Sequence, residues 1–399
     1  MIFSNLNKVA PNSMTARVYL AFLATAGIFY VNILPALVNG LITALNFTDQ
    51  QAGAVASANL YGAAGGALLI VFFIKKLNWQ LTSLILLGIL ISLDFLSIMV
   101  TEPMTLITLR FINGFIGGML VGTGFSIIAR TDGPDRTFGV LLFVQFGLGG
   151  LGLMLLPGLI PNFGIKILFF SLMAFSLVTL VMLMFLPAYE IQEKSDDSSL
   201  QNHVPARKLN WTPLLLTLFA IFLFQAGNNS LYAYIIGLGE MYGQQGAMIT
   251  TTLGLAAWLG LVGAALVVVM SDNYGYMRPL LAGLLLTIVG TVAFVYSDVD
   301  WIWITANCLI GITWAFTISY LLGLASRFDL SGQMAALGGF ASKMGLASGP
   351  AAAAYLLGDN DLTMVVWVAA AALTLCLLVV IIPATGQDKE ILKAKASGD

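Results

Sequence analysis

The feature that most constrains this chain is a series of long apolar runs. Runs of roughly 20 apolar residues, the length that spans a bilayer as a helix, recur twelve times along the sequence. Their approximate spans are 17–45, 50–74, 81–100, 105–129, 138–160, 163–187, 211–237, 246–270, 279–297, 301–325, 333–357 and 362–383. Of the 399 residues 59% are hydrophobic and 9% are charged, whereas a soluble domain carries about 25% charged residues. The sequence therefore predicts an all-α integral membrane protein with twelve transmembrane helices.

One extended polar segment, AYEIQEKSDDSSLQNHVPARKLN, separates the sixth run from the seventh. We interpret residues 188–210 as a cytoplasmic linker between an N-terminal six-helix bundle (1–187) and a C-terminal six-helix bundle (211–399). An offset of 197 residues (229 − 32) carries Asn32 onto Asn229, and it also carries Gly66 onto Gly263. Because six helices is an even number, two such halves share one topology and repeat about an axis normal to the membrane. The sequence predicts two pseudo-symmetric bundles.

The charges between the runs predict the orientation in the membrane. Apart from Lys166 and two residues inside runs, Arg110 and Lys343, every Lys and Arg falls on the side shared by both termini. Cytoplasmic loops carry an excess of Lys and Arg. Both termini are therefore expected in the cytoplasm, and the short loops and lean termini favour a bacterial cytoplasmic (inner) membrane.

The run 105–129 carries a charge among glycines. Arg110 is followed by Gly114, Gly118 and Gly122, four residues apart, which forms a stripe that another helix can approach closely. An ionisable residue inside a membrane is costly and usually functional.

A loop pattern accompanies this helix: MSDNYGYMR, between the eighth and ninth runs, contains Asp272, Gly275 and Arg278. With an arginine followed by glycines in the fourth helix, the chain resembles the major facilitator superfamily over nearly its whole length. The resemblance implies two bundles around a central cavity, lined mainly by helices 1, 4, 7 and 10, that rock to give alternating access. It also implies that Asp272, Gly275 and Arg278 form a gating loop.

Three charges lie deep inside runs: Asp94, Arg110 and Lys343. Asp94 and Arg110 flank the short turn between helices 3 and 4, so we expect them at similar depth as an ion pair, unless Asp94 titrates during transport. Lys343 has no carboxylate partner in its own half. Such a lysine must face a wet cavity, release its proton or meet an anion, so Lys343 is a candidate for both substrate binding and proton coupling.

Polar side chains concentrate on helices expected to line the cavity, where they are predicted to contact substrate together with Arg110 and Lys343. They are Asn32, Gln145, Asn228, Asn229, Tyr232, Asn307 and Trp314. Hydrogen bonding between helices would explain any one of them singly, but their concentration favours a cavity.

Enzyme chemistry is not expected. The single histidine, His203, lies in the linker, and no Gly-x-Ser-x-Gly, His-Glu-x-x-His or phosphate-loop pattern occurs. We therefore predict no catalytic residue, no metal site, no cofactor and no nucleic-acid partner.

The predicted function is secondary active transport of a small organic anion, with proton coupling as an option, by a monomer in the lipid bilayer. Two alternatives stay open: a proton-coupled exporter of lipophilic or multidrug compounds that uses Asp94, and a non-transporting membrane sensor. The sequence does not discriminate import from export.

Overall fold

The computed structural model describes residues 7–74, 77–132, 134–189, 211–270, 274–328, 333–356 and 361–397. Its helices are α1 (Met14–Ala26), α2 (Phe29–Asn32), α3 (Leu34–Leu45), α4 (Asp49–Phe73), α5 (Trp79–Met99), α6 (Pro103–Ile128), α7 (Pro134–Phe163), α8 (Lys166–Phe185), α9 (Trp211–Met241), α10 (Gly246–Met270), α11 (Met277–Ala293), the 3₁₀-helix η2 (Phe294–Tyr296), α12 (Asp300–Ser326), α13 (Gln333–Leu356) and α14 (Thr363–Ser397). Residues 190–210, most of the predicted linker, lie outside the described residues.

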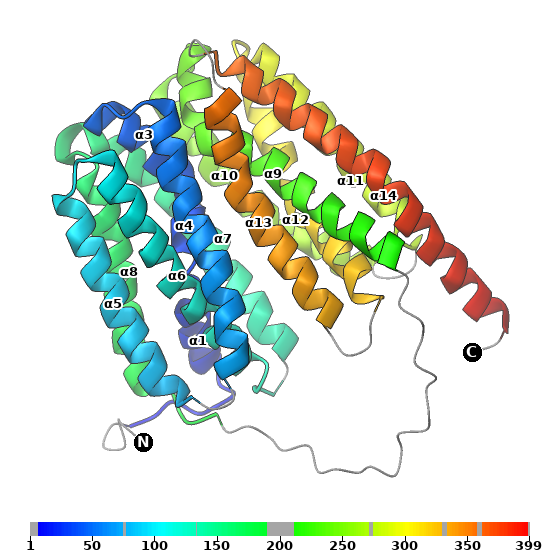
Figure 1. Ribbon diagram of the computed structural model, residues 1–399, viewed down its shortest axis with the longest axis horizontal. Helices are drawn as coiled ribbons and strands as arrows, with labels where there is room; N and C mark the ends of the chain where they lie inside the picture. The colour runs from blue at the N-terminus through cyan, green and yellow to red at the C-terminus, as the bar shows by residue number, and fades with distance from the viewer. Residues whose placement is uncertain are drawn as a thin grey trace.

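Ten of these helices are long and apolar enough to cross a membrane. Two further passes complete the twelve that the sequence predicts. Gly- and Ala-rich α13 has 24 residues, which at 1.5 Å per residue spans about 36 Å. The consecutive segments α1, α2 and α3 together make the first pass (Figure 1).

The first pass was expected as one helix over 17–45, and the structure breaks it at two points. Gly27 ends α1 where the backbone crosses α6, and a side chain at Gly27 would collide with the carbonyl oxygen of Gly117. The second break is at Ile33, and Pro35 then occupies the first turn of α3, where its missing N–H costs nothing. Asn32, the last residue of α2, is therefore placed at a break in the helix.

The predicted repeat is confirmed at the level of backbone packing. Gly66 of α4 lies against the carbonyl oxygen of Phe115 in α6, and Gly263 of α10 lies against that of Ile312 in α12. Both members of the second contact are 197 residues after those of the first. Helices in lipid associate by close packing at small residues, so these glycines fix equivalent helix crossings in the two bundles.

The two bundles join on one side of the membrane and separate on the other. An even number of passes puts the start of α1 and the end of α14 on the same side, called here the termini side; the opposite side is the far side. In Figure 1 the helices α1–α8 and α9–α14 meet at the top, on the far side, and diverge toward the bottom. One apolar core includes residues of both bundles, such as Leu41 and Leu238, whereas the cores nearer the termini side belong to one bundle each.

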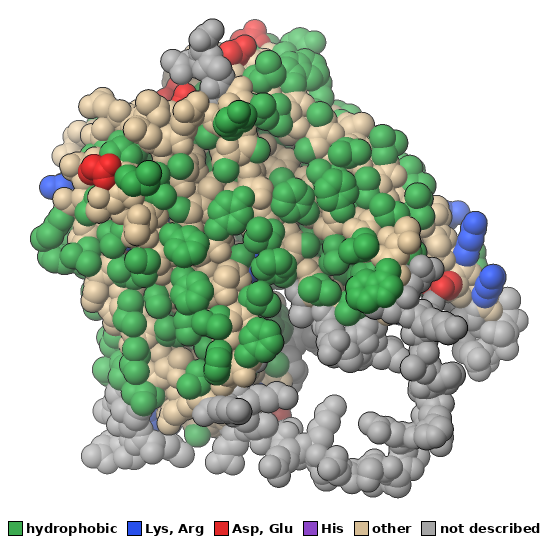
Figure 2. Space-filling model, viewed as in Figure 1, with side chains coloured by type: hydrophobic (Ala, Val, Ile, Leu, Met, Phe, Trp, Pro, Cys, Tyr) green, Lys and Arg blue, Asp and Glu red, His purple; other side chains and the backbone are tan. Residues whose placement is uncertain are grey.

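Hydrophobic side chains are spread over the face shown in Figure 2, and the few charged side chains lie mainly near its edges. Phe72 and Val268 are 70% and 79% exposed. Exposed apolar surface on membrane-spanning helices is suited to contact with lipid tails.

Candidate functional site

A cavity of about 150 Å³ lies between the bundles near the middle of the helices. Seven of the nine residues predicted to bind substrate line it: Asn32, Gln145, Asn228, Asn229, Tyr232, Asn307 and Trp314. Its other lining residues were not predicted: Val31, Phe146, Gly149, Leu253, Ala256, Ala257, Gly260, Ile310, Gly311 and Leu346. Most of these are small or apolar and do not stand out in an apolar sequence.

On the N-terminal side of the cavity, Asn32 and Gln145 are joined by two hydrogen bonds. Asn32 donates from Nδ2 to the carbonyl oxygen of Gln145 at 2.8 Å, and Gln145 donates from Nε2 to Asn32 Oδ1 at 3.3 Å. Gly149, one turn after Gln145, lets α7 approach, because a Cβ there would touch the Asn32 side chain. The break in the first pass therefore places Asn32 against α7.

On the C-terminal side, three asparagines bind main-chain carbonyl groups through their NH₂ groups. Asn228 donates to Phe224 at 2.8 Å, Asn229 to Leu346 at 2.6 Å and Asn307 to Trp303 at 2.9 Å. The Oδ1 atom of Asn228 is buried and has no partner among the described residues. Buried acceptors are normally paired, so this oxygen is an exception among the amide groups of the site.

Hydrogen bonds between the bundles surround the cavity. Tyr232 donates to the carbonyl oxygen of Asn32 at 2.9 Å, and Trp258 donates to that of Gly147 at 3.1 Å. The hydroxyl groups of Tyr61 and Ser348 are 2.8 Å apart. These contacts join α9, α10 and α13 to the N-terminal bundle, and the bond of Tyr232 closes the cavity toward the far side.

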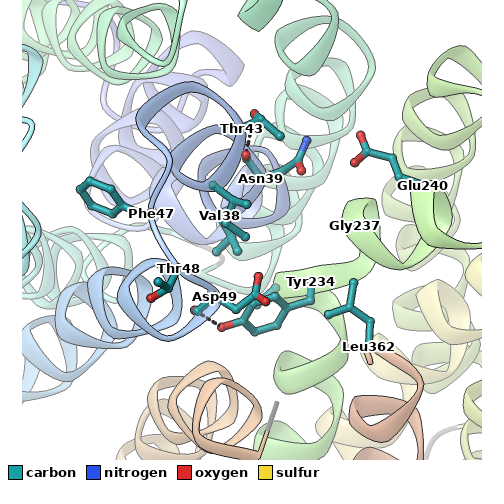
Figure 3. A pocket seen from close by; sticks show the side chains of 12 residues that line it. Val38, Asn39, Thr43, Phe47, Thr48, Asp49, Tyr234, Gly237, Glu240 and Leu362 are labelled. Atoms are coloured by element: carbon teal, nitrogen blue, oxygen red, sulfur yellow. Dashed lines mark hydrogen bonds between the residues drawn. The ribbon is translucent and has the colours of Figure 1, made fainter. Parts of the chain in front are cut away.

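A second pocket, of about 400 Å³, opens at the far-side end of the same interface (Figure 3). Asn39 and Thr43 of α3 line it from one bundle, and Glu240 of α9 from the other. Tyr234 donates across the pocket floor to the carbonyl oxygen of Asp49 at 2.9 Å. This pocket was not predicted, because its acidic residues, Asp49 and Glu240, stand at the ends of apolar runs.

Arg110 does not line the central cavity. Its side chain is fully buried inside the N-terminal bundle and forms the predicted ion pair with Asp94, with 2.9 Å between Nη2 and Oδ1. Nη2 also donates to Ser97 Oγ at 2.7 Å, and the guanidinium lies 5.2 Å from the centre of the Phe169 ring. Asn113 donates to the same Asp94 oxygen at 3.0 Å. The pair therefore ties α5 to α6 within one bundle.

Lys343 lies in α13 and also falls outside the lining of the cavity. Pro350 and Ala354, seven and eleven residues later, lie against Gly53 of α4 in the other bundle. At 3.6 residues per turn these three positions share one face of α13. Lys343 is therefore on the face that crosses to α4, nearer the termini side, where the bundles separate. Its side chain is half-buried, and within the described part of the chain it makes no hydrogen bond or ion pair.

The predicted gating loop is described in part, since Asp272 lies outside the described residues and Gly275 and Arg278 lie within them. Gly275 has a positive φ of 67°, which glycine adopts readily. Asp388 of α14 accepts hydrogen bonds from the N–H groups of Tyr276 at 2.7 Å and Met277 at 3.0 Å. A carboxylate here satisfies free N–H groups at the start of α11, so the end of α14 holds this loop.

Among the residues that the structure describes, no group of three or more His, Cys, Asp or Glu side chains is placed to hold a metal ion.

Comparisons with known proteins agree with this architecture. The family model described as Major Facilitator Superfamily matches residues 18–343. Two solved structures of the nucleoside transporter NupG have a similar fold. One, of a point mutant, has a TM-score of 0.71 at 14% identity, covering 92% of this chain and 99% of that one, and the other has 0.70 at 13%, covering 93% and 99%. A comparison with curated protein sequences found no match. With a family match over most of its length and a twelve-pass, two-bundle fold, this chain belongs to the Major Facilitator Superfamily and is a multi-pass membrane transporter.

Proposed function

We propose that this protein is a secondary transporter of a small organic anion in a bacterial cytoplasmic membrane, with both termini in the cytoplasm. Described basic residues, among them Arg130, Arg327 and Lys389, lie at the termini-side ends of helices, and acids such as Glu102 and Glu240 lie at the far-side ends. Cytoplasmic loops carry the excess of Lys and Arg. In this orientation the structure is a state that opens toward the cytoplasm.

The position of Lys343 carries the anion proposal. Its half-buried side chain lies where the two bundles separate, on the α13 face that crosses to α4, without a partner among the described residues. A cation held away from bulk water is stabilised by a bound anion. The amides of the central cavity, one turn or more away, would hold the body of the solute.

Arg110 is reassigned in this proposal from substrate binding to structure. Asp94 already neutralises its charge, Nη2 also donates to Ser97, and Asn113 donates to Asp94; Arg110 Nε and Nη1 are buried and have no hydrogen-bond partner among the described residues. The same contacts weaken the alternative of an exporter that uses Asp94 for proton exchange, because Asp94 is only 3% exposed and does not line the cavity.

An uncharged solute such as a nucleoside is the second candidate. Its support is that the central cavity is lined by amides and aromatic rings and by no charged side chain among the described residues. Amide groups and aromatic rings suit a flat molecule with donors and acceptors on its edge. The nucleoside transporter NupG shares the fold, although an identity of 14% carries the fold alone.

Thermal stabilisation of the purified protein by a panel of carboxylates, organic phosphates and nucleosides would test both candidates. We expect anions to raise the unfolding temperature of the wild type, and Lys343→Met to weaken their binding by at least about tenfold, the change for one charge-assisted hydrogen bond. Lys166→Met removes an exposed lysine on the far side and is the matched control. Unchanged anion binding by Lys343→Met would reject the anion proposal, and stabilisation of both proteins by nucleosides would favour the second candidate.

Proton coupling at Lys343 would be detected separately, as a pH dependence of the affinity for the anion. If the ammonium must be charged to hold the anion, wild-type affinity falls as the pH rises and the lysine releases its proton. Lys343→Arg would bind with little pH dependence, since arginine keeps its proton. Equal pH profiles for wild type and Lys343→Arg between about pH 5 and pH 9 would exclude Lys343 as the coupling group.

A further inference from the structure

The termini-side end of the central cavity is bounded by an aromatic contact between the bundles. Phe146 of α7 and Trp314 of α12 meet edge to face, with ring centroids 6.0 Å apart and an interplanar angle of 79°. Both line the cavity. Trp314 follows Asn307 by two turns along α12 toward the termini side, so the pair lies on the side where the bundles diverge.

The Trp314 ring is held by two other helices of its own bundle. Its indole Nε1 donates to Gln225 Oε1 in α9 at 2.8 Å, and Gln225 Nε2 donates to Ser342 Oγ in α13 at 2.7 Å. Gln225 is 2% exposed and Ser342 is 9% exposed. Both ends of the glutamine amide are thus engaged in a buried site, where an unmade hydrogen bond is costly.

These contacts divide the interface into two unequal parts. The hydrogen bond of Tyr232 closes the cavity toward the far side, and an edge-to-face ring pair bounds it toward the termini side. A single aromatic pair is a weak contact that one rotation of the indole would break. Its persistence depends on the bond that fixes the indole.

We propose that Gln225 is a positioning residue that holds Trp314 against Phe146 and thereby closes the cavity toward the termini side. Release of the indole from Gln225 opens the passage through which solute leaves or enters in this state. The proposal rests on the proposed function in that the central cavity is the transport site, but it specifies a gate and not a solute.

Accessibility of a cysteine in the cavity tests the gate without any solute. In a Cys308→Ser, Cys376→Ser background, Ala257→Cys places one thiol in the cavity lining. A membrane-impermeant maleimide is applied to right-side-out and to inverted vesicles. We expect Gln225→Leu and Trp314→Phe to accelerate labelling on the order of tenfold from the termini side only, the effect of one hydrogen bond.

Two variants separate positioning from general loosening. Gln225→Glu keeps an oxygen that accepts from the indole and from the Ser342 hydroxyl, so labelling near the wild-type rate is expected. Gln80→Leu removes another buried glutamine, which donates to the Leu186 carbonyl inside the N-terminal bundle at 3.3 Å, and it should leave labelling unchanged.

Three outcomes overturn the proposal: wild-type labelling in both Gln225→Leu and Trp314→Phe, equal acceleration in Gln80→Leu, or acceleration from both sides of the membrane. Fast labelling of Gln225→Glu would also overturn it, since the hydrogen bond would then be irrelevant. If labelling follows the expected pattern while no anion or nucleoside binds, the proposed substrate class fails and the gate stands.

Discussion

Tyr232 in α9 donates its phenolic hydrogen to the carbonyl oxygen of Asn32 at the end of α2, 2.9 Å away, and so joins the two bundles beside the central cavity. The acceptor lies at the break in the first membrane pass. We expect Tyr232→Phe to shift the population toward a far-side-open state by about fivefold, which corresponds to about 1 kcal/mol for one hydrogen bond.

Spin labels at Thr43→Cys and Met241→Cys, both exposed on the far side, would report this shift as a longer interbundle distance. Tyr242→Phe is the control, because the Tyr242 hydroxyl contacts Thr363 within the C-terminal bundle at 3.4 Å. An identical distance distribution in Tyr232→Phe and wild type would contradict the expectation.

Gly53 of α4 permits a close approach between the bundles on the far side. A Cβ at this position would collide with the Tyr234 hydroxyl and lie 2.7 Å from the Cβ of Ala354. Gly53→Leu should therefore exclude the state in which the far side is closed, and the same spin labels should report only the open distance. Gly88→Leu, at a glycine with open space around it, should behave as wild type.

The buried ion pair of the N-terminal bundle predicts unequal effects of its two substitutions. Arg110→Ala removes a fully buried side chain and leaves Asp94 without its counter-charge, which typically costs about 3–5 kcal/mol. Asp94→Asn also leaves Arg110 without its counter-charge, but it keeps the volume and an oxygen that accepts from Arg110, whose Nη2 retains Ser97. Unfolding temperatures in detergent should fall much further for Arg110→Ala. Equal losses would indicate that Asp94 has a role beyond the pair.

Glu102 gives the stability of the far side a defined pH dependence. Hydrogen bonds from the Thr105 side chain, then from the N–H groups of Thr105 and Met104, hold the pKa of Glu102 below its usual value. Its stabilising effect is therefore complete above the unfolded-state pKa of about 4.3, and it disappears as the pH falls through the folded-state pKa. Between about pH 3 and pH 6 the unfolding temperature of Glu102→Gln should vary less with pH than that of the wild type.

Much of the fold could be predicted because the bilayer restricts it so strongly. The lengths of the apolar runs predicted the number of membrane passes. The 197-residue offset predicted equivalent helix crossings in the two bundles, such as Gly66 against Phe115 and Gly263 against Ile312. The positions of the breaks in the first pass could not be predicted from the sequence. Gly27 ends α1 where the backbone meets α6, and that contact is known only from the structure. Pro35, in the same run, marks the start of α3.

The amide side chains that line the cavity could be predicted from the sequence, whereas the positions of Arg110 and Lys343 relative to the cavity could not. Asn229 and Asn307 are rare polar residues in apolar helices, and such residues favour interior faces. For Arg110 the sequence does not tell whether the polar face of α6 turns to the cavity or into its own bundle. The deciding partners, Asp94 and Phe169, come from other helices. The Gln225–Trp314 bond likewise depends on a helix contact that spacing along the chain does not reveal.

The hydrogen bonds that Tyr232, Tyr234 and Trp258 donate across the interface all end on main-chain carbonyl oxygens of the N-terminal bundle. Every amino acid supplies that oxygen, whereas few supply the donor at the right reach. Tolerance to substitution should therefore be one-sided: the residues at positions 49 and 147 can change without loss of these hydrogen bonds between the bundles, whereas the three donors cannot. Among related transporters we therefore expect the acceptor positions of the N-terminal bundle to vary in sequence, whereas the three donor residues of the C-terminal bundle stay the same.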